Sequence, residues 1–395
     1  MTPNARYAAA VDILGAVLAG APAEKTLTNW ARSNRYAGSK DRAAVRDIVF
    51  DCLRCKRSYQ YAAGFDGARG LVMGHILAAG HAVAAVFTGQ RFAPDVLSDT
   101  ERKNLEHPKE PPSDAVRLDI PDWIAPKLRH ALGDDYEDSL TALQARAPLD
   151  LRVNGKKITI AQAQAALAKD GIETTPVKGM TGALRVTSNP RRVALSGVYQ
   201  NGLVEIQDAG SQAVVANLPM NGVVRVLDYC AGGGGKTLAM AALMGDTVQF
   251  DAYDGNQTRM KDLPVRLKRA GVQARVLPND PVDAGETYDL VLLDVPCSGS
   301  GAWRRNPDAK WRFSEADLQD LQRVQAKILT RAQAMVAPNG VLAYVTCSLL
   351  RDENEAQADA FVKTCPNLVL VQTKRFHPSA GTDGFFLAIF KKQQL

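Results

Sequence analysis

The sequence predicts an α/β protein whose largest part, residues 218–395, is a doubly wound Rossmann-like domain. An all-helical domain over residues 1–112 and a small α+β domain over residues 113–217 are expected before it. The prediction rests on periodicity, because helical spacing of apolar residues gives way to a mixed pattern and then to alternating strand and helix patterns. The strand-like runs of the last part end at Asp228, Asp254, Leu277, Asp294 and Cys347.

The first part combines apolar helical stripes with positive charge. One stripe comprises Tyr7, Val11, Leu14 and Leu18. A further helical pattern covers residues 71–87, and between the two, residues 25–57 hold nine Lys or Arg against three Asp or Glu. This surplus favours a partner with a phosphate backbone, and a solvated helical face is the alternative. The proline-bearing residues 106–113 predict a linker.

The middle part is predicted to be a small α+β domain. Strand-like runs occupy residues 149–153, 183–186 and 203–206, and a helical pattern covers residues 160–169. Two kinds of periodicity over so short a stretch indicate one sheet with a helix packed against it.

The composition indicates a cytoplasmic protein. Of its 395 residues, 46% are hydrophobic, which supplies more than one core, and its six cysteines are too few and too dispersed for a disulfide scaffold. Cys52 and Cys55 form a CxxC without a second pair, so we interpret them as helix-core residues and expect no metal site. Neither a membrane-spanning run nor a signal-peptide pattern is visible in the sequence, and we expect no membrane partner.

A glycine-rich loop opens the α/β part. Residues 226–237 read as a strand, the loop and the start of a helix, so a ligand can approach the backbone closely. A Walker A loop would need glycine at Cys230, and a dinucleotide fingerprint would need it at Thr237. S-adenosylmethionine is the third candidate, because Asp254 follows about two dozen residues later and can accept hydrogen bonds from ribose hydroxyls. As an alternative, Asp254 caps a helix.

Two cysteines stand where apolar strand-like runs stop. Cys297 follows Pro296 after the run that ends at Asp294, and Cys347 follows Thr346. Because the carboxyl ends of parallel strands share one edge of a sheet, the two thiols are expected in one pocket. One would act as a nucleophile and the other as a helper in release. The alternative is that both are inert core residues.

Together these motifs resemble the RsmB/Sun (Nop2/NSUN-type) RNA cytosine-C5 methyltransferases. The resemblance covers nearly the whole chain and includes Glu353 and Asn354. It implies a NusB-like RNA-binding domain, an RRM-like domain and a methyltransferase domain, in that order. The family usually has Ala-Pro where this chain has Gly232 and Gly233. The residues that carry the resemblance are 230–237, Asp254, Arg259, 294–301, 304–308, Trp311 and 346–348.

The resemblance also implies the roles of individual residues. Cys347 would attack carbon 6 of the base, Asp294 would hydrogen-bond the polar edge of the base, and Cys297 would assist release. Asp280 would bind the adenine side of S-adenosylmethionine, with Asn279 or Asp283 as alternatives. The residues implied to bind the cofactor are Cys230, Ala231, Gly232, Gly233, Gly234, Gly235, Lys236, Asp254, Asp280 and Asp294.

The implied partner is RNA, bound by a monomer without metal. Small-subunit ribosomal RNA is the expected target and transfer RNA the runner-up, and the base must leave its stack to meet the thiol. Cations that would hold the flanking phosphates lie in residues 25–57 and at Arg304, Arg305, Lys310 and Arg312. Two other classes remain as alternatives, a non-catalytic RNA-binding or ribosome assembly factor and a P-loop NTPase.

Overall fold

The structure is a computed structural model that describes residues 1–106 and 112–393. It contains two compact units, one formed by residues 1–146 with 303–313 and the other by residues 147–302 with 314–395. The predicted linker at 106–113 lies mainly outside the described residues, and the predicted domain boundaries stay predictions. Within the described ranges, no helix is both long and apolar enough to cross a membrane.

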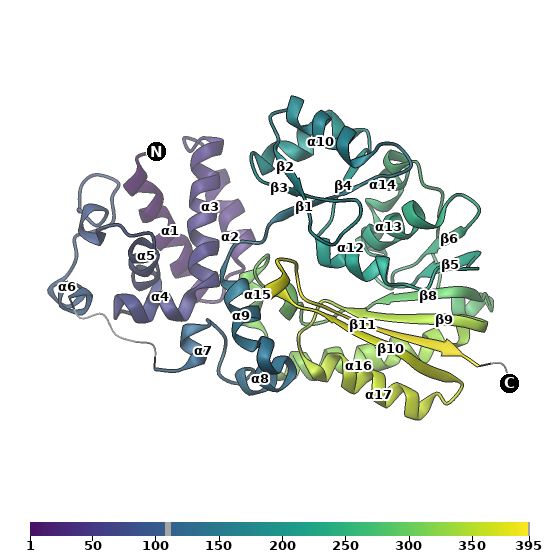
Figure 1. Ribbon diagram of the computed structural model, residues 1–395. Coiled ribbons are helices and arrows are strands. Elements are labelled where there is room, and N and C mark those ends of the chain that lie inside the picture. Colours follow the sequence, from purple (N-terminus) through teal and green to yellow (C-terminus); the bar gives the residue numbers. More distant parts are fainter. Residues whose placement is uncertain (107–111, 394–395) are drawn as a thin grey trace. The chain divides into compact units, whose positions relative to one another are not determined.

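The first unit is built from helices, which confirms the predicted class of this part (Figure 1). Residues such as Leu14, Val49 and Leu71 are fully buried in its core. The helix predicted over residues 71–87 is wrong in extent, because α5 ends at Ala78 and Gly80 then adopts a left-handed φ of +72°. The helices are α1 (Pro3–Leu18), α2 (Ala23–Ser33), α3 (Ser39–Arg54), α4 (Lys56–Ala63), α5 (Gly67–Ala78), α6 (Asp99–Leu105), α7 (Asp114–Arg117), α8 (Ala125–Leu132), α9 (Tyr136–Gln144) and α15 (Pro307–Arg312).

The segment 303–313 belongs to this helical unit although it follows the Pro-Cys motif in sequence. Trp311 Nε1 donates to the Leu53 carbonyl at 2.6 Å, and Lys310 Nζ donates to the Arg54 carbonyl at 3.0 Å. Burial lowers the pKa of Lys310 to about 8, although Asp119 opposes the shift. Lys310 and Arg54 are buried, so the expectation that they hold phosphates is wrong.

The second unit begins with a four-stranded antiparallel sheet in the order β2-β3-β1-β4. This is the strand order of a ferredoxin-like fold, and it confirms the predicted small α+β part. The three predicted strands and the helix are present, whereas β2 was not predicted. The elements are β1 (Leu149–Val153), α10 (Ile160–Lys169), β2 (Thr174–Pro176), β3 (Ala183–Val186), α11 (Gly197–Gln200) and β4 (Val204–Ile206).

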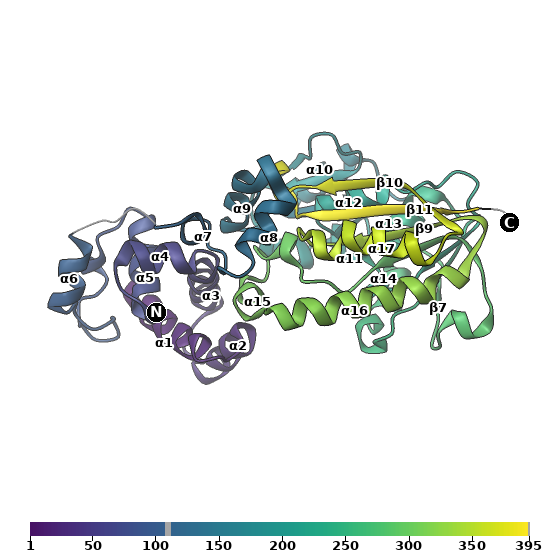
Figure 2. The same cartoon turned by 90° about the horizontal axis from the view of Figure 1, so that it is seen from below.

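The same unit contains a seven-stranded sheet in the order β10-β11-β9-β8-β5-β6-β7. Strands β7, β6, β5, β8 and β9 are parallel, whereas β11 runs antiparallel to both β9 and β10. Helices α16 and α17 cover one face and α12 and α13 the other (Figures 1 and 2), which confirms the doubly wound fold. The elements are α12 (Ala209–Ala216), β5 (Arg225–Asp228), α13 (Gly235–Met244), β6 (Gln249–Ala252), α14 (Leu263–Ala270), β7 (Arg275–Val276), β8 (Tyr288–Asp294), α16 (Glu315–Ala332), β9 (Val336–Thr346), α17 (Glu355–Thr364), β10 (Leu368–Phe376) and β11 (Phe385–Lys392).

Polar contacts fix the small sheet to the large one. Asn154 Nδ2 donates to the Ala270 carbonyl at 2.9 Å, at the end of α14. The buried Glu205 of β4 pairs with Arg266 and Arg269 of α14. Arg266 also donates to the carbonyl of Gly233. The small sheet is therefore connected to the glycine-rich loop through Glu205 and Arg266.

Candidate active site

The predicted site residues lie on loops at the carboxyl edge of the large sheet. Strand β5 is the switch point of the topology, since β6 and β8 flank it on opposite sides. The loops that follow β5, β8 and β9 leave the sheet at this edge. Open α/β sheets bind ligands at such switch points.

Glycine is required at two positions of the loop after β5. Gly232 has φ +50° and Gly234 has φ +78°, a region that L side chains rarely adopt. A Cβ atom at Gly234 would also lie 2.1 Å from Leu263 Cδ1. The loop then enters α13 at Gly235, and the helix N-terminus faces this edge. A backbone cradle of this kind fits a ligand that contacts main-chain atoms.

Asp254 ties the loop after β6 to the glycine-rich loop. Its Oδ2 accepts a hydrogen bond from Gly232 N at 3.0 Å and lies 3.2 Å from Arg259 Nη1. Its Oδ1 accepts from Asn256 N at 2.9 Å. Strand β6 ends at Ala252, so the predicted end at Asp254 is wrong by two residues. The carboxylate holds the turn that follows the strand, and its contact with a ribose stays a prediction.

Asp280 lies beside two aromatic rings. It accepts a hydrogen bond from the Tyr229 hydroxyl at 2.7 Å and from Arg331 Nε at 2.5 Å. The ring of Tyr229 stacks on that of Tyr253, with centroids 5.1 Å apart. Burial and then the hydrogen bond to Asp280 raise the pKa of Tyr229. Arg331, which comes from α16 and pairs with Asp280, was not among the predicted site residues.

Lys236 and Asp294 form a short ion pair. Lys236 Nζ, in the first turn of α13, lies 2.5 Å from Oδ2 of Asp294 at the end of β8. Burial by itself would lower the pKa of Lys236, but the charge of Asp294 and its hydrogen bond outweigh burial, so this pKa is raised. Cys347 contributes in the same direction, which places the ammonium group within electrostatic reach of that sulfur.

Asp228 closes β5 beneath the glycine-rich loop. Its Oδ2 accepts from Thr237 Oγ1 at 2.6 Å, and its Oδ1 has no hydrogen-bond partner in the described part of the chain. Burial raises its pKa to about 7. Asp228 was predicted only as a strand end, although an acid between a buried strand and a glycine-rich loop is a signal of a functional site.

The structure brings the two predicted cysteines together. Cys297 Sγ and Cys347 Sγ are 3.4 Å apart, and Gly301 N donates to the Cys347 carbonyl at 2.9 Å. The hydrogen bond to Cys347, together with burial, raises the pKa of Cys297 well above its ordinary value. Cys297 is therefore held as a thiol. Burial likewise raises the pKa of Cys230 well above its ordinary value.

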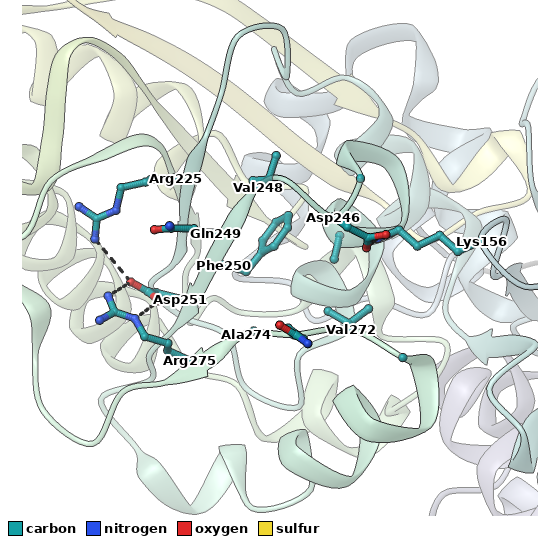
Figure 3. A pocket seen from close by; sticks show the side chains of 14 residues that line it. Lys156, Arg225, Asp246, Val248, Gln249, Phe250, Asp251, Val272, Ala274 and Arg275 are labelled. Carbon is teal, nitrogen blue, oxygen red and sulfur yellow. Dashed lines mark hydrogen bonds and ion pairs between the residues drawn. The ribbon is translucent and has the colours of Figure 1, made fainter.

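A cavity of about 850 Å³ lies at the opposite end of the strands (Figure 3). Arg225, at the start of β5, and Arg275, at the start of β7, line it and both pair with Asp251. Phe250 and Val272 contribute apolar surface. Since the cysteines follow the carboxyl ends of β8 and β9, this cavity is not part of the site described above.

Two family profiles match the chain. The family described as 16S rRNA methyltransferase RsmB/F matches residues 215–391. The family described as an RsmF/B-like methyltransferase ferredoxin-like domain matches residues 120–193, in agreement with the strand order of the small sheet. These matches confirm the resemblance drawn from the motifs.

Curated relatives extend the match over most of the chain. The ribosomal RNA small subunit methyltransferase B of Vibrio cholerae serotype O1 is 33% identical over 292 residues, which cover 71% of this chain and 67% of that protein. The protein of the same name from Enterobacter sp. (strain 638) is 32% identical over 317 residues, which cover 75% and 72%. The matched part thus spans roughly two thirds of the length of these relatives.

Solved structures support the fold. That of PH0851 covers 99% of both chains, with a TM-score of 0.77 and 23% identity. The crystal structure of NSun6 from Pyrococcus horikoshii with SFG covers 70% of this chain and 99% of its own, with a TM-score of 0.62 and 18% identity. The family match excludes the P-loop NTPase alternative and confirms S-adenosylmethionine as the predicted cofactor. The chain belongs to the 16S rRNA methyltransferase RsmB/F family and is an RNA methyltransferase that uses S-adenosylmethionine.

Proposed function

We propose that this protein transfers a methyl group from S-adenosylmethionine to carbon 5 of a cytosine in small-subunit ribosomal RNA, through a covalent bond between Cys347 Sγ and carbon 6. The observation that carries the proposal is the pair of sulfurs 3.4 Å apart at the edge that also holds the pair of Lys236 and Asp294. The names of the curated relatives support ribosomal RNA as the substrate.

The residues at the carboxyl edge fit S-adenosylmethionine. The left-handed backbone at Gly232 and Gly234 supplies an open main-chain cradle. Asp254 would accept hydrogen bonds from the ribose hydroxyls, and Asp280 would lie on the adenine side with the Tyr229 ring. When bound, the cofactor supplies a methyl group on a positively charged sulfur.

Nucleophilic attack by Cys347 solves the chemical problem of the reaction. Carbon 5 of cytosine is a poor nucleophile until a thiolate adds to carbon 6 and shifts electron density into the ring. Carbon 5 can then form the bond to the methyl group. Lys236 and Asp294 would contact the polar edge of the base and stabilise the charge that develops there.

Release requires the reverse of the attack. After methyl transfer, the proton on carbon 5 passes to a water molecule and the bond between carbon 6 and sulfur breaks, which returns the thiolate of Cys347. Cys297 would assist this step. Its raised pKa keeps it protonated, so it can donate a hydrogen bond to the departing sulfur without competing as the nucleophile.

Trapping the covalent adduct tests these roles. With labelled RNA and S-adenosylmethionine, Cys297→Ala should methylate once and stall, leaving a protein–RNA species that survives a denaturing gel. Cys347→Ala should form no adduct and no product, because the bond to carbon 6 cannot form. The double variant should also form none. Cys365→Ala serves as the matched control, since that thiol is buried in the core of the α/β domain.

Other outcomes would contradict specific parts of the proposal. An adduct trapped by Cys347→Ala would show that Cys297 is the nucleophile. Full activity in both single variants would leave the two thiols as core residues and favour a reaction without a covalent intermediate. Methylation of transfer RNA in place of small-subunit ribosomal RNA would retain the chemistry and correct the substrate.

A further inference from the structure

Glu353 connects the two loops that carry the cysteines. It ends a short 3₁₀ helix (Arg351–Glu353) that follows the Thr-Cys loop, and its side chain is fully buried, with 0% of the residue exposed. Its Oε1 accepts hydrogen bonds from Ser298 N at 2.8 Å and from Gln325 Nε2 at 3.0 Å. Its Oε2 accepts from Ser298 Oγ and Ser348 Oγ, each at 2.5 Å.

The two serines are the residues that directly follow the two cysteines. Ser298 follows Cys297, and Ser348 follows Cys347. One carboxylate therefore binds both loops one residue away from each sulfur. Gln325 adds a third support, because its Nε2 also donates to the Pro296 carbonyl at 2.9 Å, on the other side of Cys297.

Glu353 places a carboxylate in the buried interior of the second unit. In residues 1–106 and 112–393, no ion pair joins Glu353 to a Lys, Arg or His. A buried carboxylate without a cation is costly, and its hydrogen bonds recover only part of the lost hydration. Residues that cost stability in this way are typical of functional sites.

We infer that Glu353 is a positioning residue, which sets the separation and orientation of the Cys297 and Cys347 sulfurs by holding Ser298 and Ser348 on one carboxylate. The inference rests on the proposed function for its consequence in catalysis, but the sulfur separation itself is independent of any reaction. The charge of Glu353 also helps to raise the pKa of Cys297, so it favours the thiol form of that residue.

A trivalent arsenical measures the separation without RNA. Phenylarsine oxide bridges two close thiols, forming two As–S bonds and releasing one water. Glu353→Ala should weaken its binding at least tenfold, because Ser298 and Ser348 lose the acceptor they share and the separation of the two sulfurs is no longer fixed. Glu353→Gln should stay within about threefold of the parent, since its amide oxygen can accept from Ser298 N and its amide nitrogen can donate to the serine hydroxyls. Cys347→Ala gives the background of the remaining thiols.

Turnover provides the second measurement. For Glu353→Ala, kcat for methyl transfer should fall roughly ten- to a hundredfold, as expected for misplaced reacting groups, while KM for RNA and cofactor affinity change less than about twofold. Glu353→Gln should restore most of kcat. Asp359→Ala is the matched control, because it removes an exposed carboxylate from the neighbouring helix α17.

The results separate this inference from the proposed function. Unchanged arsenical binding and kcat in Glu353→Ala would overturn the positioning role. A parallel loss of cofactor affinity and melting temperature in Glu353→Ala indicates general unfolding, and Ser298→Ala then decides: arsenical binding equal to that of the parent would overturn the positioning role. If Ser298→Ala weakens arsenical binding, the role is supported even where Glu353→Ala folds poorly. Methyl transfer that persists in Cys347→Ala would refute the proposed function alone.

Discussion

At the residue scale, three charged groups beneath the glycine-rich loop are coupled. Lys236 pairs directly with Asp294, and Asp228 interacts with both through its charge. Burial by itself would lower the pKa of Lys236, but Asp294 is the main partner that raises it, whereas among the described residues Asp228 accepts a hydrogen bond from Thr237 on one oxygen and has no partner on the other. A carboxyl group in that position retains its proton to a higher pH than usual.

Asp228 therefore predicts a pH dependence of stability. Its pKa is about 7 in the folded chain, against an ordinary value of 3.8. The folded state holds this proton more tightly, so the associated stability is fully present below about pH 4 and is lost as the pH rises to about 7. Asp228→Asn removes the titration. The unfolding free energy of the variant minus that of the parent should therefore be larger at about pH 8 than at about pH 4, by on the order of 1–4 kcal/mol.

Urea denaturation of the variant and the parent at about pH 4 and at about pH 8 measures this difference in unfolding free energy. The variant keeps an oxygen that accepts the Thr237 hydroxyl, so the comparison isolates the charge. Stability curves that stay parallel from acid to alkaline pH would mean that the carboxyl group titrates normally.

Asp254 supports a prediction about cofactor binding. Asp254→Ala should weaken the binding of S-adenosylmethionine by roughly 1–3 kcal/mol, because hydrogen bonds to the ribose are lost. The same substitution frees Gly232 N, so Arg259→Ala is the useful control, since it removes the partner of the carboxylate but keeps the acceptor. Calorimetry with the cofactor alone gives both affinities. Parent-like affinity in Asp254→Ala would place the ribose elsewhere.

At the element scale, the ends of the strand-like runs predicted where the site lies better than the runs predicted the strands of the large sheet. The runs ending at Asp228 and Asp294 are strands with those ends, and the rule for parallel strands correctly placed Cys297 and Cys347 together. The hairpin of β10 and β11 was not predicted. Strand β10 lies at the edge of the sheet and leaves Val371 exposed, so it lacks the buried apolar run of a central strand.

Long-range contacts account for the rest of what the sequence could not reveal. Periodicity describes neighbours along the chain, and it gave no sign that residues 303–313 join the helical unit through Trp311. The role of Glu353 was hidden for the same reason, because its partners Ser298 and Gln325 are 55 and 28 residues away in sequence. A motif can identify such residues, but only the fold shows what they hold.

At the scale of the whole molecule, part of the positive charge of residues 25–57 lines one hollow on the helical unit. A hollow of about 630 Å³ in the helical unit is lined by Arg32, Arg35 and Arg42, together with Thr28 and Ala31. The three arginines are exposed, and in the described ranges none of them forms an ion pair. Arg42 is partly fixed in place, since its Nε donates to the Ala37 carbonyl. Unpaired cations around a hollow fit an RNA backbone better than a merely solvated helix.

Reversal of these three charges is the test of RNA binding by the whole protein. If Arg32, Arg35 and Arg42 each neutralise a phosphate, changing all three to Glu should weaken RNA affinity and flatten its salt dependence. The slope of log affinity against log salt should fall in magnitude by roughly 2, because each contact with a single strand contributes about 0.7. Cofactor affinity should not change, since the residues proposed to bind the cofactor lie in the other unit. Equal salt slopes for variant and parent would identify the surface as a solvated face.

The matched control reverses three exposed lysines of the second unit, Lys327, Lys363 and Lys391. Because both triple variants change the net charge equally, only a local contact with RNA can make their slopes differ.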